Sequence, residues 1–179
     1  MIANILNAIT LSRIFCAILI YLILFLESNY SLALFLFFVA SFSDFLDGYL
    51  ARKTDSVSVL GEILDPIADK LLIVFVLIGL SINLDSFLIG FISAIIISRE
   101  IWVAALRDIN SRNNQSDKTK VTFLAKTKTA IQMLAILIYL FGLTLNSMMI
   151  LFFADIILII ALLVTIQTGF QYTISTFKK

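Results

Sequence analysis

Six apolar runs dominate this chain, and their length restricts the folds that it can adopt. Each run is close to the roughly 20 residues that an α-helix needs to cross the hydrocarbon core of a bilayer. The runs lie near residues 5–26, 30–50, 62–82, 86–107, 128–146 and 148–172. Hydrophobic residues make up 61% of the 179 residues, whereas soluble domains contain roughly 45–50%. Because every backbone polar group in lipid needs a partner within a helix or a closed barrel, the sequence predicts an all-α integral membrane protein, with residues 1–179 forming one six-helix domain.

The basic residues between the runs predict how the chain crosses the membrane. Lys and Arg lie after the second run, around the connection between the fourth and fifth runs, and at the C-terminus. The connections on the other side contain Glu27 and Asp85 but no Lys or Arg. Cytoplasmic loops carry the excess of Lys and Arg, so we expect both termini in the cytoplasm. The N-terminus lacks a basic segment and a small-residue cleavage site, so we expect the first run to be a retained anchor.

Four aspartates lie at the facing ends of the second and third runs. Asp44 and Asp47 are three residues apart and Asp65 and Asp69 are four apart, so each pair lies on one helix face. Carboxylates inside an apolar chain are costly and indicate a functional site, and four together repel one another unless cations hold them. Oxygen ligands of this kind suit Mg²⁺, Mn²⁺ or Ca²⁺ rather than zinc. The predicted topology brings all four to one cytoplasmic cavity, where two metal ions could polarise a diphosphate.

Small and basic residues follow the first aspartate pair. Gly48 and Ala51 would let a nucleotide approach the helix backbone, and the guanidinium of Arg52 suits phosphate recognition. The chain has no histidine, which excludes histidine acid–base chemistry and histidine metal ligation. Alternatively, the aspartates could lock helices together or form the ion site of a small cation transporter. Arg52 argues against transport, since a transported cation needs no phosphate ligand.

The order of these residues resembles a family signature. Asp44-x-x-Asp47-Gly48-x-x-Ala51-Arg52, eight residues, and then Gly61-x-x-x-Asp65-x-x-x-Asp69 is similar to the signature of the CDP-alcohol phosphatidyltransferases. The resemblance implies six transmembrane helices, a homodimer, and a cytoplasmic site in which two divalent cations, Mg²⁺ or Mn²⁺, are held by the four aspartates. It further implies that Asp69 is also the general base for the acceptor hydroxyl. The residues implied to bind the CDP group are Gly48, Ala51, Arg52, Ser58 and Gly61.

Residues 4–13, 98–101 with 105–107, and 126–133 resemble the phosphatidylglycerophosphate synthases within that family. Leu6 and Ala125 depart from the proline and glycine that are usual there. The resemblance implies transfer of a phosphatidyl group from CDP-diacylglycerol to sn-glycerol 3-phosphate in a bacterial-type inner (cell) membrane, and it adds Asn7 and Thr10 to the CDP-binding residues. Other acceptors remain open, namely phosphatidylglycerol, as in a cardiolipin synthase, or an inositol phosphate.

A phosphorylated acceptor is a dianion and needs fixed cations beside the metals. We expect its phosphate ligands among Arg99, Arg107, Lys126 and Lys128, at the cytoplasmic ends of the fourth and fifth runs. Lys126 and Lys128 diverge by about 200° on a regular helix, so one of them faces the site, and we favour Lys126. For Arg99, a buried structural pair with the adjacent Glu100 is an equal alternative.

Four further residues lie near the same ends of the runs. Arg13 and Lys70 fall within predicted spans, where they can reach the interface or pair with the acids. Trp102 and Tyr172 are typical of interfacial anchors, and we expect no catalytic role for either.

Overall fold

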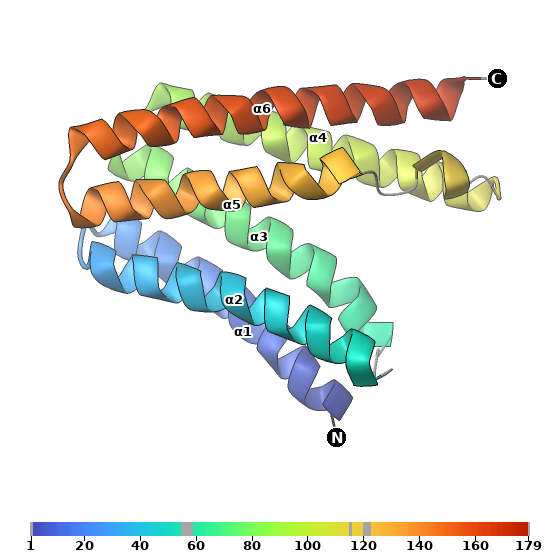
Figure 1. Cartoon of the computed structure of the whole chain (residues 1–179), viewed down its shortest axis with the longest axis horizontal. Helices are drawn as coiled ribbons and strands as arrows, with labels where there is room; N and C mark the ends of the chain where they lie inside the picture. Colours follow the sequence, from blue (N-terminus) through green and yellow to red (C-terminus); the bar gives the residue numbers. More distant parts are fainter. Residues whose placement is uncertain (1, 55–58, 115, 120–122, 179) are drawn as a thin grey trace.

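The computed structural model describes residues 2–54, 59–114, 116–119 and 123–178. Within these ranges the chain forms six long α-helices and one short 3₁₀ helix (Figure 1). The α-helices are α1 (Ile2–Phe25), α2 (Tyr30–Thr54), α3 (Val59–Asn83), α4 (Phe87–Arg112), α5 (Phe123–Thr144) and α6 (Met148–Phe177), and η1 (Ser116–Thr119) lies between α4 and α5. The predicted all-α fold class is confirmed.

Four of the described helices contain stretches long and apolar enough to cross a membrane, namely Asn7–Phe25, Phe87–Arg112, Thr127–Thr144 and Met148–Phe177. In α2 the side chains are described as far as Ser43, and Tyr30–Ser43 is an apolar helical segment. In α3 the charged residues Asp65, Asp69 and Lys70 lie close together in the first half of the helix. These features show a multi-pass membrane protein.

The helices continue beyond the predicted apolar runs at one end of the bundle. α4 reaches Arg112 rather than 107, α5 begins at Phe123 rather than near 128, and α6 reaches Phe177 rather than 172. Hydropathy marks only the part of a helix that lies in lipid, whereas the backbone hydrogen bonds of a helix already formed continue into water at little cost per added residue. The predicted polar connection at 108–126 is therefore shorter than expected.

Three tight turns at the opposite end share one geometry. Glu27, Asp85 and Asn146 follow α1, α3 and α5 with φ angles of 48°, 44° and 48°. In each turn the next backbone N–H donates to the carbonyl five residues earlier, which is the long bond of a Schellman motif. These turns make hairpins of α1–α2, α3–α4 and α5–α6, so both ends of the described chain lie at the other end of the bundle (Figure 1).

The apolar core lies in the half of the bundle next to the tight turns. Leu24, Phe37, Leu77, Ile92 and Ile136, from five helices, are buried there. α1 packs along α3, α5 packs along α6, and α4 packs against α6. Toward the end with the chain termini, α1–α3 diverge from α4–α6 (Figure 1), and polar side chains take the place of apolar ones.

Candidate active site

A cavity of about 610 Å³ opens between α3, α4 and α5 at the divergent end. Its volume lies within the roughly 300–1,000 Å³ of typical small-molecule sites. Its charged lining residues are Asp65, Asp69, Lys70, Arg99, Glu100, Arg107 and Lys128. Carboxylates from α3 thus form one wall of the cavity, and a mainly cationic group from α4 and α5 forms the other.

Arg13 of α1 joins the two aspartates of α3. Its Nη2 lies 3.1 Å from Asp65 Oδ1 and its Nη1 lies 2.6 Å from Asp69 Oδ1. Thr10, one turn earlier on α1, donates its hydroxyl to Asp65 Oδ1 at 2.6 Å. The Arg13 side chain is 1% exposed, whereas those of Asp65 and Asp69 are 50% and 29% exposed. α1 therefore anchors both carboxylates, and of the two alternatives for Arg13, reaching the interface or pairing with the acids, the structure shows the pairing.

Asp65 and Asp69 share one face of α3, as their four-residue spacing predicts. Their carboxylate oxygens are the kind of ligand that hard divalent cations prefer. The described residues contain no group of three or more acids, cysteines or histidines that could hold a metal ion. The other half of the predicted site lies outside the residues whose side chains the structure describes. These positions are Asp44, Asp47, Gly48, Ala51, Arg52 and Ser58.

Two of the predicted CDP-binding positions are described besides Thr10. Asn7 is half-buried on α1, one turn before Thr10, and Gly61 is half-buried near the start of α3. Both lie toward the divergent end of their helices, so the structure brings them to the same end of the bundle as the aspartates of α3.

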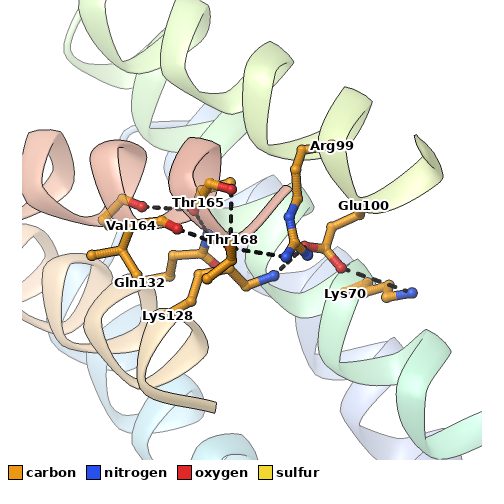
Figure 2. A network of polar contacts seen from close by, with 9 residues as sticks. Lys70, Arg99, Glu100, Lys128, Gln132, Val164, Thr165 and Thr168 are labelled. Atoms are coloured by element: carbon orange, nitrogen blue, oxygen red, sulfur yellow. Dashed lines mark hydrogen bonds and ion pairs between the residues drawn. The ribbon is translucent and has the colours of Figure 1, made fainter. Parts of the chain in front are cut away.

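Glu100 lies at the centre of the cationic wall and contacts bases from three helices (Figure 2). Lys128 of α5 donates to Glu100 Oε1, and Arg99 Nη1 lies 2.9 Å from the same oxygen. Lys70 Nζ lies 3.9 Å from Oε2. The side chains of Lys128 and Arg99 are 6% and 9% exposed. Because a buried cation is costly without a counter-charge, Glu100 is what permits both cations at this depth.

Two residues of α6 fix the course of the Arg99 side chain. Its Nη2 donates to Thr168 Oγ1 at 2.9 Å (Figure 2). The side chain crosses the helix at Gly169, where an added Cβ would lie 3.1 Å from Arg99 Cγ. Glycine at this position lets the arginine pass close to the α6 backbone and reach the cavity.

The comparisons with known proteins agree with this geometry. A family model described as CDP-alcohol phosphatidyltransferase matches residues 3–167. The chain belongs to the CDP-alcohol phosphatidyltransferase family. It is 39% identical over 172 residues to the CDP-diacylglycerol–glycerol-3-phosphate 3-phosphatidyltransferase of Rickettsia bellii, which covers 94% of this chain and 93% of the relative.

Two further relatives carry the same name. The Haemophilus influenzae protein is 38% identical over 149 residues, covering 82% of this chain and 78% of the relative. The Escherichia coli protein is 31% identical over 135 residues, covering 74% of each. The family resemblance inferred from the aspartate signature is confirmed.

In this CDP-alcohol phosphatidyltransferase, three of the four predicted acceptor-phosphate residues line the cavity. These are Arg99, Arg107 and Lys128. Lys126 was favoured as the inward lysine, but Lys128 occupies the cavity wall and is 5% exposed. The side chain of Lys126 lies outside the described residues. A spacing of two residues predicts that one lysine faces inward, but only the packing of α5 against its neighbours decides which.

Sequence reasoning missed the position of Tyr172 in this phosphatidyltransferase site, and for Lys70 it left open whether the side chain reaches the interface or pairs with an acid. Tyr172, expected as an interfacial anchor, is 3% exposed and lies between two arginines. The Cζ atoms of Arg99 and Arg107 lie 5.7 and 5.4 Å from its ring centroid, within the range of cation–π contacts. Lys70 joins the cavity directly after Asp69 in sequence. That adjacency was the available signal for Lys70, whereas nothing in the local sequence indicated the position of Tyr172.

Proposed function

We propose that this protein transfers the phosphatidyl group of CDP-diacylglycerol to sn-glycerol 3-phosphate, giving phosphatidylglycerophosphate and CMP. The observation that carries the proposal is the opposition of two kinds of charge across one cavity. Asp65 and Asp69 of α3 lie on one side, and Arg99, Arg107 and Lys128 of α4 and α5 lie on the other. Lys70 follows Asp69 on α3, and its Nζ lies 3.9 Å from Glu100 Oε2. Relatives that carry the name of this reaction and align with nearly the whole chain support it.

The cations suit a phosphorylated acceptor in particular. A phosphate monoester carries close to two negative charges at neutral pH, and Lys and Arg bind phosphate oxygens through charge-assisted hydrogen bonds. Arg107 is exposed and Lys70 is 42% exposed, so these two are the most accessible to an incoming anion. Arg99 and Lys128 lie deeper. We therefore propose that Arg99, Arg107 and Lys128 bind the acceptor phosphate and that Lys70 assists them. Because Lys126 diverges from Lys128 by about 200° on a regular helix, we propose that it faces the lipid headgroups instead.

Asp69 would act on the acceptor hydroxyl. Its carboxylate takes the proton from the primary hydroxyl of glycerol 3-phosphate, and the resulting oxygen attacks the β-phosphorus of CDP-diacylglycerol. The bond from that phosphorus to the oxygen of CMP breaks, and CMP leaves with the electron pair. Arg13 holds Asp69 Oδ1 at 2.6 Å, which fixes the direction of the carboxylate. General-base assistance of this kind contributes about 10²–10⁴-fold in rate.

Asp44, Asp47, Asp65 and Asp69 would hold two divalent cations, with Mg²⁺ and then Mn²⁺ as the best matches to carboxylate oxygens. When bound, such cations would neutralise the diphosphate and the charge that develops when it is split. Thr10, whose hydroxyl donates to Asp65, would act by holding that carboxylate. Asn7, Gly48, Ala51, Arg52, Ser58 and Gly61 are proposed to contact the CDP group.

We further propose six membrane crossings, a homodimer, and an active site at the cytoplasmic face of a bacterial-type inner membrane. The location of both described chain ends at the same end of the bundle as the cavity supports this orientation. The basic residues at that end fit the excess of positive charge in cytoplasmic segments.

Replacing Asp69 by Asn tests the mechanism. In detergent with CDP-diacylglycerol, Mg²⁺ and glycerol 3-phosphate, this variant should release CMP at least about 100-fold more slowly. Asp108→Asn is the matched control, because Asp108 is an exposed acid of α4 that pairs with Arg112 outside the cavity. Near-wild-type turnover of the Asp69→Asn variant would remove Asp69 from the mechanism.

A further inference from the structure

Glu100 is an acid in the middle of a wall that is proposed to bind an anion. Of its two oxygens, Oε1 contacts both Lys128 and Arg99, and Oε2 lies 3.9 Å from Lys70. The three cations come from α5, α4 and α3, respectively, so the carboxylate joins three helices (Figure 2). A carboxylate here would weaken phosphate binding if its charge were its only effect, and this calls for another role.

The cations that contact Glu100 would separate without it. Lys128 and Arg99 both approach one oxygen atom, so their like charges are close together. Their side chains are 6% and 9% exposed, and solvent and salt screen buried charges much less than exposed ones. Removing the carboxylate would leave the mutual repulsion uncompensated, and each cation would move toward water or toward another partner.

Glu100 also limits the freedom of two long side chains. Lys and Arg each lose considerable rotamer entropy when they are immobilised, and a ligand that has to immobilise them binds less tightly. Thr168 holds one end of the Arg99 guanidinium and Glu100 holds the other, at 2.9 Å each. For Lys128, the hydrogen bond to Glu100 is the contact that directs its ammonium group along the cavity wall.

The charges that remain match the proposed acceptor. Lys70, Arg99, Arg107 and Lys128 contribute four positive charges and Glu100 contributes one negative charge, so the cationic wall keeps a net positive charge for a phosphate dianion even with the carboxylate present. We propose that Glu100 is a positioning residue that holds Arg99 and Lys128 in the arrangement that receives the acceptor phosphate. This inference rests on the proposed function, because it assigns a role within the acceptor half of that site.

Replacing Glu100 by Gln separates positioning from simple electrostatics, because the two predict opposite signs. Removing a negative charge makes the wall more positive, so charge alone predicts a lower KM for glycerol 3-phosphate. Positioning predicts a KM about tenfold higher, the scale expected when a charge-assisted contact that orders the ligands is lost. The kcat at saturating acceptor and the KM for CDP-diacylglycerol should stay within about twofold of wild type.

Asp108→Asn on the same helix is the matched control and should leave all three constants unchanged. An unchanged or lower acceptor KM in the Glu100→Gln variant would overturn the inference, and so would an equal rise in the KM for CDP-diacylglycerol. Glu100→Asp covers the case in which the Gln variant does not fold. It keeps the charge on a shorter side chain, and its acceptor KM should rise about threefold, whereas no rise would contradict positioning.

A double variant tests whether Glu100 acts through Lys128. Variants whose residues act as one unit are non-additive, so the acceptor KM of Glu100→Gln with Lys128→Met should rise by clearly less than the product of the two single rises, with the remaining effect of Glu100→Gln coming from Arg99. A fully multiplied effect would overturn the inference. CMP release by the wild-type protein separates a failure of the proposed function from a failure of the role assigned to Glu100. If its CMP release does not depend on glycerol 3-phosphate, the proposed function fails. If it does, and the Glu100 variants behave like the control, only the role of Glu100 fails.

Discussion

Replacing Arg13 by Met should destabilise the protein more than any exposed ion-pair variant. The arginine is 1% exposed and makes charged contacts of 3.1 and 2.6 Å to Asp65 and Asp69. A hydrogen bond to a charged group contributes about 1.5–3 kcal/mol when it is buried. The aspartates are 50% and 29% exposed, so solvent reduces this contribution. Taking roughly half of the sum for two such contacts gives a loss of about 1.5–3 kcal/mol.

Such a loss corresponds to a Tm lowered by about 3–12 °C for a chain of this size. Trp102 is the single tryptophan of the chain, and its Nε1 donates to Thr173 of α6 at 2.9 Å. Its fluorescence during heating in detergent therefore reports on the separation of α4 from α6. Arg112→Met is the control, because the Arg112 and Asp108 side chains are 76% and 58% exposed. An exposed pair of this kind contributes about 0.3–0.5 kcal/mol, so the control should shift Tm by about 2 °C or less.

The effect of Mg²⁺ on the Tm of the Arg13→Met variant tests the proposed metal site. Without Arg13, two carboxylates lose a fixed positive charge, and a bound cation can replace it. Adding Mg²⁺ should therefore raise the Tm of the Arg13→Met variant more than that of wild type, as expected for a ligand that binds only the folded state. An Arg13→Met variant with the Tm of the Arg112→Met control, in the absence of Mg²⁺, would refute the reasoning.

Three further variants test the surroundings of the site and one of its turns. Tyr172→Leu should raise the KM for glycerol 3-phosphate about threefold through loss of the cation–π contacts, whereas Tyr172→Phe, which keeps a ring, should stay near wild type. Gly169→Ala should raise the same KM severalfold, because its Cβ would lie 3.1 Å from Arg99 Cγ and displace that side chain; an unchanged KM would show that Arg99 can shift freely. Glu27→Gly should raise Tm by about 1–4 °C, since Glu27 has a φ of 48° that glycine adopts without strain. Asn146→Gly should raise it less, because asparagine tolerates this conformation better.

Local features of this chain were predictable from sequence and contacts between helices were not. Helical spacing alone predicted that Asp65 and Asp69 share a face of α3, and apolar length predicted the helices themselves. The burial of Tyr172 between Arg99 and Arg107 depends on how α6 packs against α4. The two contacts of Arg13 depend in the same way on the packing of α1 along α3. Sequence offered pairing and snorkelling as alternatives for Arg13, and the geometry of two helices decided between them.

Which of Lys126 and Lys128 faces the cavity also depends on contacts between helices. A spacing of two residues places Lys126 and Lys128 on different faces of a helix, but the rotation of α5 about its axis is determined by the side chains packed against it. Gln132, one turn after Lys128, donates to Thr165 of α6 at 3.0 Å and is 2% exposed. This contact fixes the face of α5 that carries Lys128 toward the cavity.

The most direct test of the account is CMP release by the purified protein in detergent. The reaction contains CDP-diacylglycerol and Mg²⁺ and is run without acceptor, with glycerol 3-phosphate, with phosphatidylglycerol, and with inositol 1-phosphate. The account predicts release that requires glycerol 3-phosphate and is lost in the Asp69→Asn variant. Release only with another acceptor would contradict the assigned substrate and leave the family intact. No release with any acceptor from folded protein, together with cation flux in proteoliposomes, would contradict the account as a whole.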